Sequence, residues 1–278
     1  MSTVLSRRAI SLRRPAAPGV ILAALVLAVL AVVVVAPGLF TSIDPLAASA
    51  SGSLQPPSPA HLFGTDQSGR DVFARVIYGA RYSLAVGVGA SAIALIAGLI
   101  IGVLSGLAHP AVDSVVNRAV TIAMSFPEFL LALVVIAIVG PGQLSLVVAL
   151  SIAAAPAYAR VARSQTFVVK RAGYVTSARS LGVSAPLIVL RHIVPNTLGP
   201  LAVMATIGVG TAIVSAAGLS FLGLGPAAPA PEWGVILSEG RNLLDRAPWI
   251  TLFPGLVITV TVVSISVVGR YLQSRSTR

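Results

Sequence analysis

Residues 83–107 have the sequence SLAVGVGASAIALIAGLIIGVLSGL, 25 consecutive positions without a charged side chain. A helix of about 20 residues crosses the roughly 30 Å hydrocarbon core of a bilayer, so this stretch is long enough to span a membrane. The sequence predicts an all-α membrane protein with six transmembrane helices, because helices satisfy their own backbone groups in lipid. Five further apolar windows lie at 19–40, 119–140, 143–159, 197–218 and 248–269.

The overall composition agrees with a chain built for a bilayer. Hydrophobic residues make up 56% of the 278 positions and charged residues 10%, whereas soluble domains carry about 25% charged residues. Cysteine is absent, which excludes disulfides and thiolate metal sites. The three histidines, His61, His109 and His192, have no metal-ligand spacing. We therefore expect no metal site and no catalytic constellation in this chain.

The distribution of basic residues predicts the orientation in the membrane. With the N-terminus inside, 14 of the 19 Lys and Arg residues fall in cytoplasmic segments, and six of the eight acidic residues fall outside. Lys and Arg concentrate on the cytoplasmic side of membrane proteins, so both termini are expected to be cytoplasmic. The net charge of +11 then needs no nucleic-acid partner. A twin-arginine export signal at Ser6-Arg7-Arg8 is a weaker interpretation, because the apolar run after it is as long as a full span.

The predicted spans divide the chain into three parts. Residues 1–80 hold a cytoplasmic tail, the first span and an extracytoplasmic segment, residues 81–271 form a core of five spans, and residues 272–278 are a cytoplasmic tail. Within the core, residues 160–196 are expected to be a cytoplasmic loop and residues 219–247 an outer loop.

Small and aromatic residues indicate how the spans pack. Gly98, Gly102 and Gly106 recur at four-residue spacing in the second span, which gives a flat stripe where another helix can approach closely. Trp233 and Trp249 are the only tryptophans, and we expect them near the outer interface, where indole rings anchor helices. These features predict a helical bundle without indicating a function.

A short amphipathic pattern precedes the second span. From Ser68 onward, the apolar residues 72, 73, 76 and 77 fall on one helical face. The pattern predicts an interfacial helix, with Asp71 and Arg75 as an i, i+4 ion pair. Thr65 or Asp66 is expected to cap this helix, because a short oxygen-bearing side chain satisfies free N–H groups.

The chain has no visible energy source of its own. Its only lysine, Lys170, follows no glycine loop, so the phosphate-binding pattern of an ATPase is absent. An ion-driven carrier needs several ionisable groups inside the membrane, and the six windows contain one, Glu128, beside Pro127. Two interpretations of Glu128 stay open: a polar contact in a water-filled path, or a residue near the cytoplasmic end of its helix, close to Arg118 or the headgroups.

The segment 160–196 is polar and organised within an apolar chain. It contains six basic residues and no acidic one. Gly182 is expected to end a first short helix, and Pro186 fits the first turn of a second one that finishes before Pro195. Two short helices joined at a glycine form a compact knob that contacts a partner, although a solvated basic loop is the alternative interpretation.

Residues 174–196 also resemble the cytoplasmic loop of bacterial ATP-binding-cassette importer permeases. The pattern of that loop is E-A-A-x-x-x-G, nine residues, then I-x-L-P; Gly182, Pro195 and Ala178 match it. Thr176 replaces the glutamate and Ser177 the first alanine, while His192 and Val194 stand at the I and L positions. The loss of the glutamate removes a charge that could pair with the ATPase.

Two outer segments extend the resemblance. Residues 61–71, HLFGTDQSGRD, are similar to the segment before the second span in the C subunit of dipeptide, oligopeptide and nickel permeases. Residues 219–225, LSFLGLG, and 231–234, PEWG, resemble the last outer loop of the same subunit. The outer residues carrying this resemblance are Gly64, Thr65, Asp66, Arg70, Asp71, Glu232 and Trp233.

The resemblance implies a type I importer permease fold and a permease rather than an enzyme. It implies peptide import through a bacterial plasma membrane, with nickel chelates, glutathione or another small solute as alternatives. The implied partners are a homologous second permease subunit, an extracytoplasmic substrate-binding protein and two cytoplasmic ATPase subunits that hold ATP and Mg²⁺, while this chain holds no cofactor. An ion-coupled carrier acting alone and a membrane scaffold are the competing hypotheses. The residues expected to contact the ATPase are Tyr174, Thr176, Ser177, Ala178, Arg179, Gly182, Val183, Pro186, Arg191 and Pro195.

Overall fold

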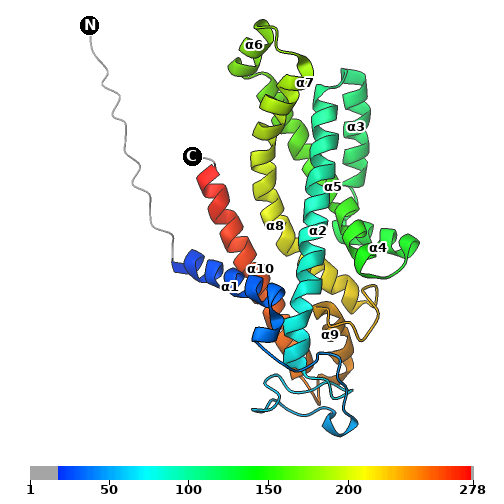
Figure 1. Cartoon of the computed structure of the whole chain (residues 1–278). Helices are drawn as coiled ribbons and strands as arrows, with labels where there is room; N and C mark the ends of the chain where they lie inside the picture. Colours follow the sequence, from blue (N-terminus) through cyan, green and yellow to red (C-terminus); the bar gives the residue numbers. More distant parts are fainter. Residues whose placement is uncertain (1–17, 277–278) are drawn as a thin grey trace.

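The computed structural model describes residues 18–276, and the regular structure within this range is helical (Figure 1). Five helices are long and apolar enough to cross a membrane, or six if the bent pair α3 and α4 is one span. The expected all-α, multi-pass architecture is therefore confirmed. The main helices are α1 (Pro18–Val35), α2 (Val72–Leu107), α3 (Pro110–Ala123), α4 (Glu128–Val139), α5 (Gln143–Lys170), α6 (Gly173–Ser180), α7 (Ala185–Ile188), α8 (Val194–Phe221), α9 (Trp233–Gly240) and α10 (Trp249–Ser276).

The tails lie partly outside the described residues. Residues 1–17, which carry the twin-arginine alternative and four of the expected cytoplasmic arginines, are not described, nor are residues 277–278. Three 3-10 turns punctuate the connections, and a π-helical turn joins α7 to α8. They lie at Pro37–Leu39, Ala50–Gly52 and Arg241–Leu243, with the π-turn at Val189–Ile193.

Helix α2 differs from the expected interfacial helix followed by a span. It is one continuous helix of 36 residues, because no proline interrupts the backbone hydrogen bonds of this segment. Asp71, rather than Thr65 or Asp66, caps it by accepting a hydrogen bond from the Ala74 N–H at 2.7 Å. The amphipathic pattern was therefore a helix start and not a separate surface helix.

The expected span at 119–140 is broken. Helix α3 ends at Ala123, α4 begins at Glu128, and the two are bent by 91°. Pro127 lies at the break, where it lacks a backbone N–H and disfavours helical backbone at the residue before it. Glu128 is therefore in the first turn of α4, at the break, rather than inside a continuous helix.

Helices α2, α5 and α8 form the centre of the bundle, with α10 against α8 and α1 against α10 (Figure 1). The glycine stripe of α2 lies at its contact with α5. A methyl group added at Gly98 or Gly102 would overlap atoms of Tyr158 or Ala159, and one at Gly106 would lie 2.9 Å from Thr166 Cβ. The predicted close packing of this stripe is confirmed.

Substitution of Gly102 by alanine is expected to destabilise the bundle. The added methyl overlaps the Ala159 carbonyl and the Ala162 side chain, and overpacking of this kind costs about 1–3 kcal/mol. The measurement is the thermal unfolding temperature of the purified permease in detergent. The control is Gly89→Ala on the same helix, where the methyl would lie 3.5 Å from Val147, an ordinary contact. Equal unfolding temperatures for the two variants would contradict the close approach.

Candidate functional site

Helices α6 and α7 project beyond the ends of α2 and α5, at the end of the bundle opposite α9 (Figure 1). We call the segment from Gly173 to Ile188 the knob. The segment expected to be a loop at 160–196 is mostly helical, since α5 continues to Lys170 and only residues 171–172 separate it from α6. The knob is therefore carried directly on the end of α5.

The second knob helix does not finish before Pro195 as expected. The helical path continues from Ala185 to Phe221 through the π-turn, in which the Val194 N–H donates to the Val189 carbonyl. Pro195 lies in the first turn of α8, where a missing N–H is tolerated. The Asn196 side chain donates to the His192 carbonyl at 2.6 Å. Helix α7, the π-turn and α8 therefore form one helical unit.

Gly182 ends α6, as the sequence predicts. Its φ is +79°, in the left-handed region. Its N–H donates to the Arg179 carbonyl at 3.0 Å, and the Val183 N–H donates to the Ala178 carbonyl at 3.1 Å. These two bonds form a Schellman motif, which satisfies the last carbonyl groups of a helix. The turn between α6 and α7 is therefore well defined.

The knob has an inner face that packs and an outer face that is exposed. On the inner face, Val175 and Ile188 are buried against Val169 of α5 and Val103 of α2. On the outer face, apolar side chains are strongly exposed, with Leu181 at 84% and Tyr174 at 47%. Leu190, on the π-turn beside the knob, is 67% exposed. An anchored element with an apolar exposed face is typical of a docking surface.

The structure brings most of the expected ATPase-contact residues together. Thr176, Ser177, Arg179, Gly182 and Pro186 are exposed on the knob. Two others, Ala178 and Val183, pack toward the inner cluster. Arg191 is on the π-turn and Pro195 at the start of α8, so these two lie beside the knob rather than on it. The exposed leucines were not among the residues singled out from the sequence.

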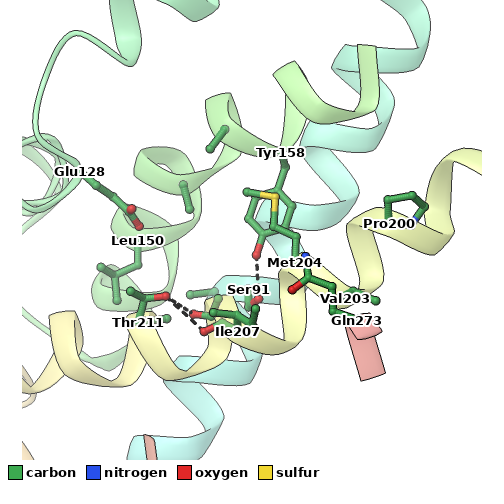
Figure 2. Close-up of a pocket in the computed structure, with 15 residues that line it drawn as sticks. Ser91, Glu128, Leu150, Tyr158, Pro200, Val203, Met204, Ile207, Thr211 and Gln273 are labelled. Atoms are coloured by element: carbon green, nitrogen blue, oxygen red, sulfur yellow. Dashed lines mark hydrogen bonds between the residues drawn. The ribbon is translucent and has the colours of Figure 1, made fainter. Parts of the chain in front are cut away.

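A cavity of about 270 Å³ lies among α2, α5 and α8, next to the start of α4 (Figure 2). Most of its lining is apolar. Small-molecule pockets usually measure roughly 300–1,000 Å³, so this volume lies just below that range. The polar side chains that line the cavity are Ser91, Glu128, Tyr158, Thr211 and Gln273.

The hydroxyl groups of the cavity are joined to the helices around it. Ser91 Oγ donates to the Ala205 carbonyl at 2.9 Å and lies 3.2 Å from the Tyr158 hydroxyl, so the tyrosine is the donor in the second bond. Thr211 Oγ1 lies 3.3 Å from the carbonyls of Ile207 and Gly208, to which it donates. These bonds fix the polar wall of the cavity.

Glu128 extends its carboxylate toward this wall from the opposite side (Figure 2). Within residues 18–276, no ion pair joins Glu128 to Arg118. The geometry therefore favours the cavity interpretation of Glu128 over the interpretation that pairs it with Arg118. Sequence reasoning did not find Ser91 or Tyr158, because each is flanked by alanines and forms no pattern with other polar residues of its helix.

The outer motifs meet in a buried charge cluster formed by Asp66, Arg70, Arg75 and Glu239. Asp66 Oδ2 lies 2.6 Å from Arg70 Nε and 2.7 Å from Arg75 Nη1. Glu239, at the end of α9, pairs with both arginines. Asp66 and Arg75 are fully buried. The cluster ties the segment before α2 to α9, although the two are more than 160 residues apart in sequence.

The expected ion pair between Asp71 and Arg75 does not form. Asp71 instead lies 2.8 Å from His61 Nδ1 and caps α2. Arg75 points to Asp66 and Glu239. An N-cap side chain must turn back toward the free N–H groups of its own helix, which takes it away from the residue four positions later.

Glu232 and Trp233 attach α9 to α2. Glu232 caps α9 by accepting from the Val235 N–H at 3.0 Å, and Ser83 Oγ donates to it at 3.2 Å. Burial raises the pKa of the Glu232 carboxyl group. Trp233 is fully buried and its indole N–H donates to the Val76 carbonyl at 2.9 Å. The expectation that Trp233 anchors the protein at the membrane interface is wrong, because this side chain fills the core instead.

In the part of the chain that the structure describes, no group of three or more His, Cys, Asp or Glu residues could hold a metal ion. The fold and its sites define a class of protein: a multi-pass membrane component with a cavity among its helices and an exposed helical knob at one end.

Comparison with known families places the chain within this class. Residues 98–278 match the family described as "Binding-protein-dependent transport system inner membrane component". The chain belongs to this family. It is a multi-pass inner-membrane permease subunit of an ATP-binding-cassette transport system and not an enzyme, and the family implies ATPase and binding-protein partners.

Individual relatives are similar over most of the chain. The dipeptide transport system permease protein DppC of Alkalihalophilus pseudofirmus is 41% identical over 231 residues, which cover 83% of this chain and 76% of the relative. The glutathione transport system permease protein GsiD of Pectobacterium atrosepticum is 40% identical over 213 residues, 77% of this chain and 71% of the relative.

Solved structures show the same fold. The MetNI methionine ABC transporter, described as inward facing, contains a chain that matches with a TM-score of 0.60 at 22% identity, covering 73% of this chain and 97% of that one. A chain of an amino acid ABC transporter matches with a TM-score of 0.56 at 15% identity, covering 74% and 94%. The type I importer permease fold implied by the sequence is therefore supported.

Proposed function

We propose that this chain forms one half of the translocation path of an ATP-driven importer of di- or oligopeptides. The other half is a homologous permease subunit, and two ATPase subunits and an external binding protein complete the complex. The resemblance of the outer motifs and the similarity to a dipeptide permease support this substrate class. Glutathione is the second candidate, because two groups of relatives divide between dipeptide and glutathione permeases.

The proposed orientation places the knob in the cytoplasm and the α9 end outside. The basic residues Arg160, Arg163, Lys170, Arg171 and Arg179 lie near the knob end of α5 or on the knob itself, and basic residues are enriched on the cytoplasmic side. Both termini are then cytoplasmic. The α9 end, which contains the buried charge cluster, then faces the outside, where the binding protein docks.

The main support for the proposal is that the knob is connected through α5 and α8 to the walls of the cavity. The knob is anchored on the end of α5 and runs through the π-turn into α8. Tyr158 of α5 and Thr211 of α8 line the cavity. A displacement of the knob by the ATPase therefore moves two walls of the cavity together, which is how a two-state helical element couples distant sites. The exposed residues Leu181, Leu190 and Tyr174 supply the contact with the ATPase.

Thr176 modifies this contact. It occupies the position of the glutamate in the resembled loop, is exposed, and lies 3.4 Å from the Ala172 carbonyl, to which it donates. A neutral residue here leaves the basic and apolar side chains of the knob to provide the docking energy. We therefore propose that docking depends on the leucines and arginines rather than on an acid at this position.

The test is uptake by the complete complex in proteoliposomes. The chain is reconstituted with its second permease subunit, the ATPase subunits and the binding protein, and uptake of labelled alanyl-alanine is measured. The importer predicts uptake that requires internal ATP and survives a proton-gradient uncoupler. Uptake that the uncoupler abolishes, without any need for ATP, would show an ion-coupled carrier. Parallel uptake of labelled glutathione decides between the two substrate candidates.

A further inference from the structure

Resting on the importer function proposed above, we infer that the cavity selects solutes that carry a protonated amine, with Glu128 as the charge-selecting residue. The chemical class is a free α-ammonium group, as at the N-terminus of a peptide. The inference stands on the position of the carboxylate, on the hydrogen-bonding state of the cavity wall, and on the charges around it.

The break between α3 and α4 brings Glu128 to the cavity. Helix α3 ends at Ala123 and Pro127 is the N-cap residue of α4, so that α4 packs against α5 and α8 rather than continuing the line of α3. The carboxylate points toward the cavity and the side chain is exposed in the single chain. The bend between α3 and α4 therefore determines that Glu128 lies at the cavity.

The cavity has one formal charge among its described lining residues. That charge is the carboxylate of Glu128, because the lining contains no Lys, Arg or His. Among the side chains that the structure describes, residues 18–274, Glu128 belongs to no ion pair. An ionised carboxylate in a membrane cavity is costly unless it is partnered or wetted. A bound cation therefore gains the interaction that the protein itself does not supply.

The hydroxyl groups of the wall offer acceptors. Ser91 gives its hydrogen to the Ala205 carbonyl, and Tyr158 gives its hydrogen to Ser91 Oγ. Thr211 gives its hydrogen back to the carbonyls of its own helix. What remains on these oxygens is lone pairs. The wall and the carboxylate thus favour a ligand that donates hydrogen bonds.

An ammonium group matches this arrangement. It carries three N–H donors, no acceptor and one positive charge. The cavity offers no cation to any carboxylate. A solute with several carboxylates and one amine therefore fits less well than a zwitterionic dipeptide, which carries one carboxylate.

A purely structural role for Glu128 makes a different prediction. An acid in the first turn of a helix interacts favourably with the helix dipole, so its loss could weaken α4 without changing selectivity. The two roles separate in a measurement of charge preference, because a weaker helix lowers binding of charged and neutral probes alike.

The experiment measures binding to the complete membrane complex, with both permease and both ATPase subunits in lipid nanodiscs. The binding protein is left out so that its own selectivity does not enter. The probes are alanyl-alanine and N-acetyl-alanyl-alanine, which differ in the ammonium charge. We expect the parent complex to bind the free dipeptide about tenfold more tightly, the gain of one charged hydrogen-bonded contact. Glu128→Gln should bring the ratio near one, and Glu128→Asp should keep the preference.

A charge reversal and a stability measurement complete the design. Glu128→Lys should reverse the preference toward the acetylated probe, which keeps its carboxylate and has no ammonium. Unfolding temperatures of all variants show that each complex is folded. A Glu128→Gln complex that is folded and keeps the parent's preference would overturn the inference, while ATP-driven dipeptide uptake by the parent would leave the importer function intact. A parent complex without ATP-driven uptake of any peptide would overturn the proposed function itself.

Discussion

A chain with Gly182 replaced by tryptophan is expected to insert normally, while uptake falls at least about tenfold and no longer follows ATP hydrolysis. Loss of a central interface contact commonly has this magnitude. Gly182 is exposed at the turn between α6 and α7 with a φ of +79°. A bulky L-residue in the left-handed region costs about 1–2 kcal/mol, and the indole would project from the surface that we propose as the contact with the ATPase.

The measurements are membrane insertion, ATPase activity stimulated by the loaded binding protein, and uptake, all in the same proteoliposomes. The matched control is Gly182→Asn, because asparagine tolerates left-handed backbone and adds little bulk to the turn. We expect its uptake to equal that of the parent. Parent-like uptake by Gly182→Trp would refute the coupling role of the knob and favour the scaffold hypothesis for this chain.

The knob shows what the sequence could predict and what it could not. Gly182 was predicted to end a helix because glycine alone adopts positive φ without cost. The extension of α5 was missed, because its basic residues suggested a loop. Yet Ala162, Thr166 and Val169 are buried at helical spacing beyond the apolar window, and arginine and lysine are good helix formers. The helical spacing of these residues, rather than the mean hydropathy, indicated that the helix continues beyond the apolar window.

The break in the third window has a similar explanation. An average over residues 119–140 is strongly apolar, so a window analysis joins α3 to α4. The proline at position 127 is a local signal for a boundary, since it affects its own backbone and the residue before it. Proline is also tolerated within membrane helices, so the sequence could not decide between a kink and a bend of 91°.

Of the polar residues that line the cavity, only Glu128 was singled out from the sequence. Ser91, Tyr158 and Thr211 come from three helices and form no sequence pattern. Their meeting depends on the close approach of α2 to α5 and on Gly208, where a side chain would collide with the Tyr158 hydroxyl. Tertiary packing sets such a site, and a single sequence reports it only through small residues at the contacts.

Replacement of Asp66 by asparagine is expected to destabilise the α9 end by about 3–5 kcal/mol, the usual cost of breaking a buried ion pair by removing one partner. Asp66 Oδ2 lies within 2.7 Å of Arg70 and Arg75, and its Oδ1 accepts from the Ser68 and Arg70 backbone N–H groups. An asparagine leaves Glu239 alone against two arginines. The measurement is the unfolding temperature of the complex, with hydrogen exchange of residues 49–70 as a local readout.

The control is Asp44→Asn, the same chemical change at an exposed aspartate that accepts one local hydrogen bond from the Leu46 N–H. Surface changes of this kind usually stay within about 0.5 kcal/mol.

The origin of the destabilisation by Asp66→Asn can be tested with the double variant Asp66→Asn and Arg75→Met. If uncompensated charge dominates, removing one charge of each sign should cost less than the sum of the single changes. Strict additivity would instead assign the cost to the lost hydrogen bonds of the loop before α2, and equal stability of Asp66→Asn and Asp44→Asn would refute the structural role of the cluster.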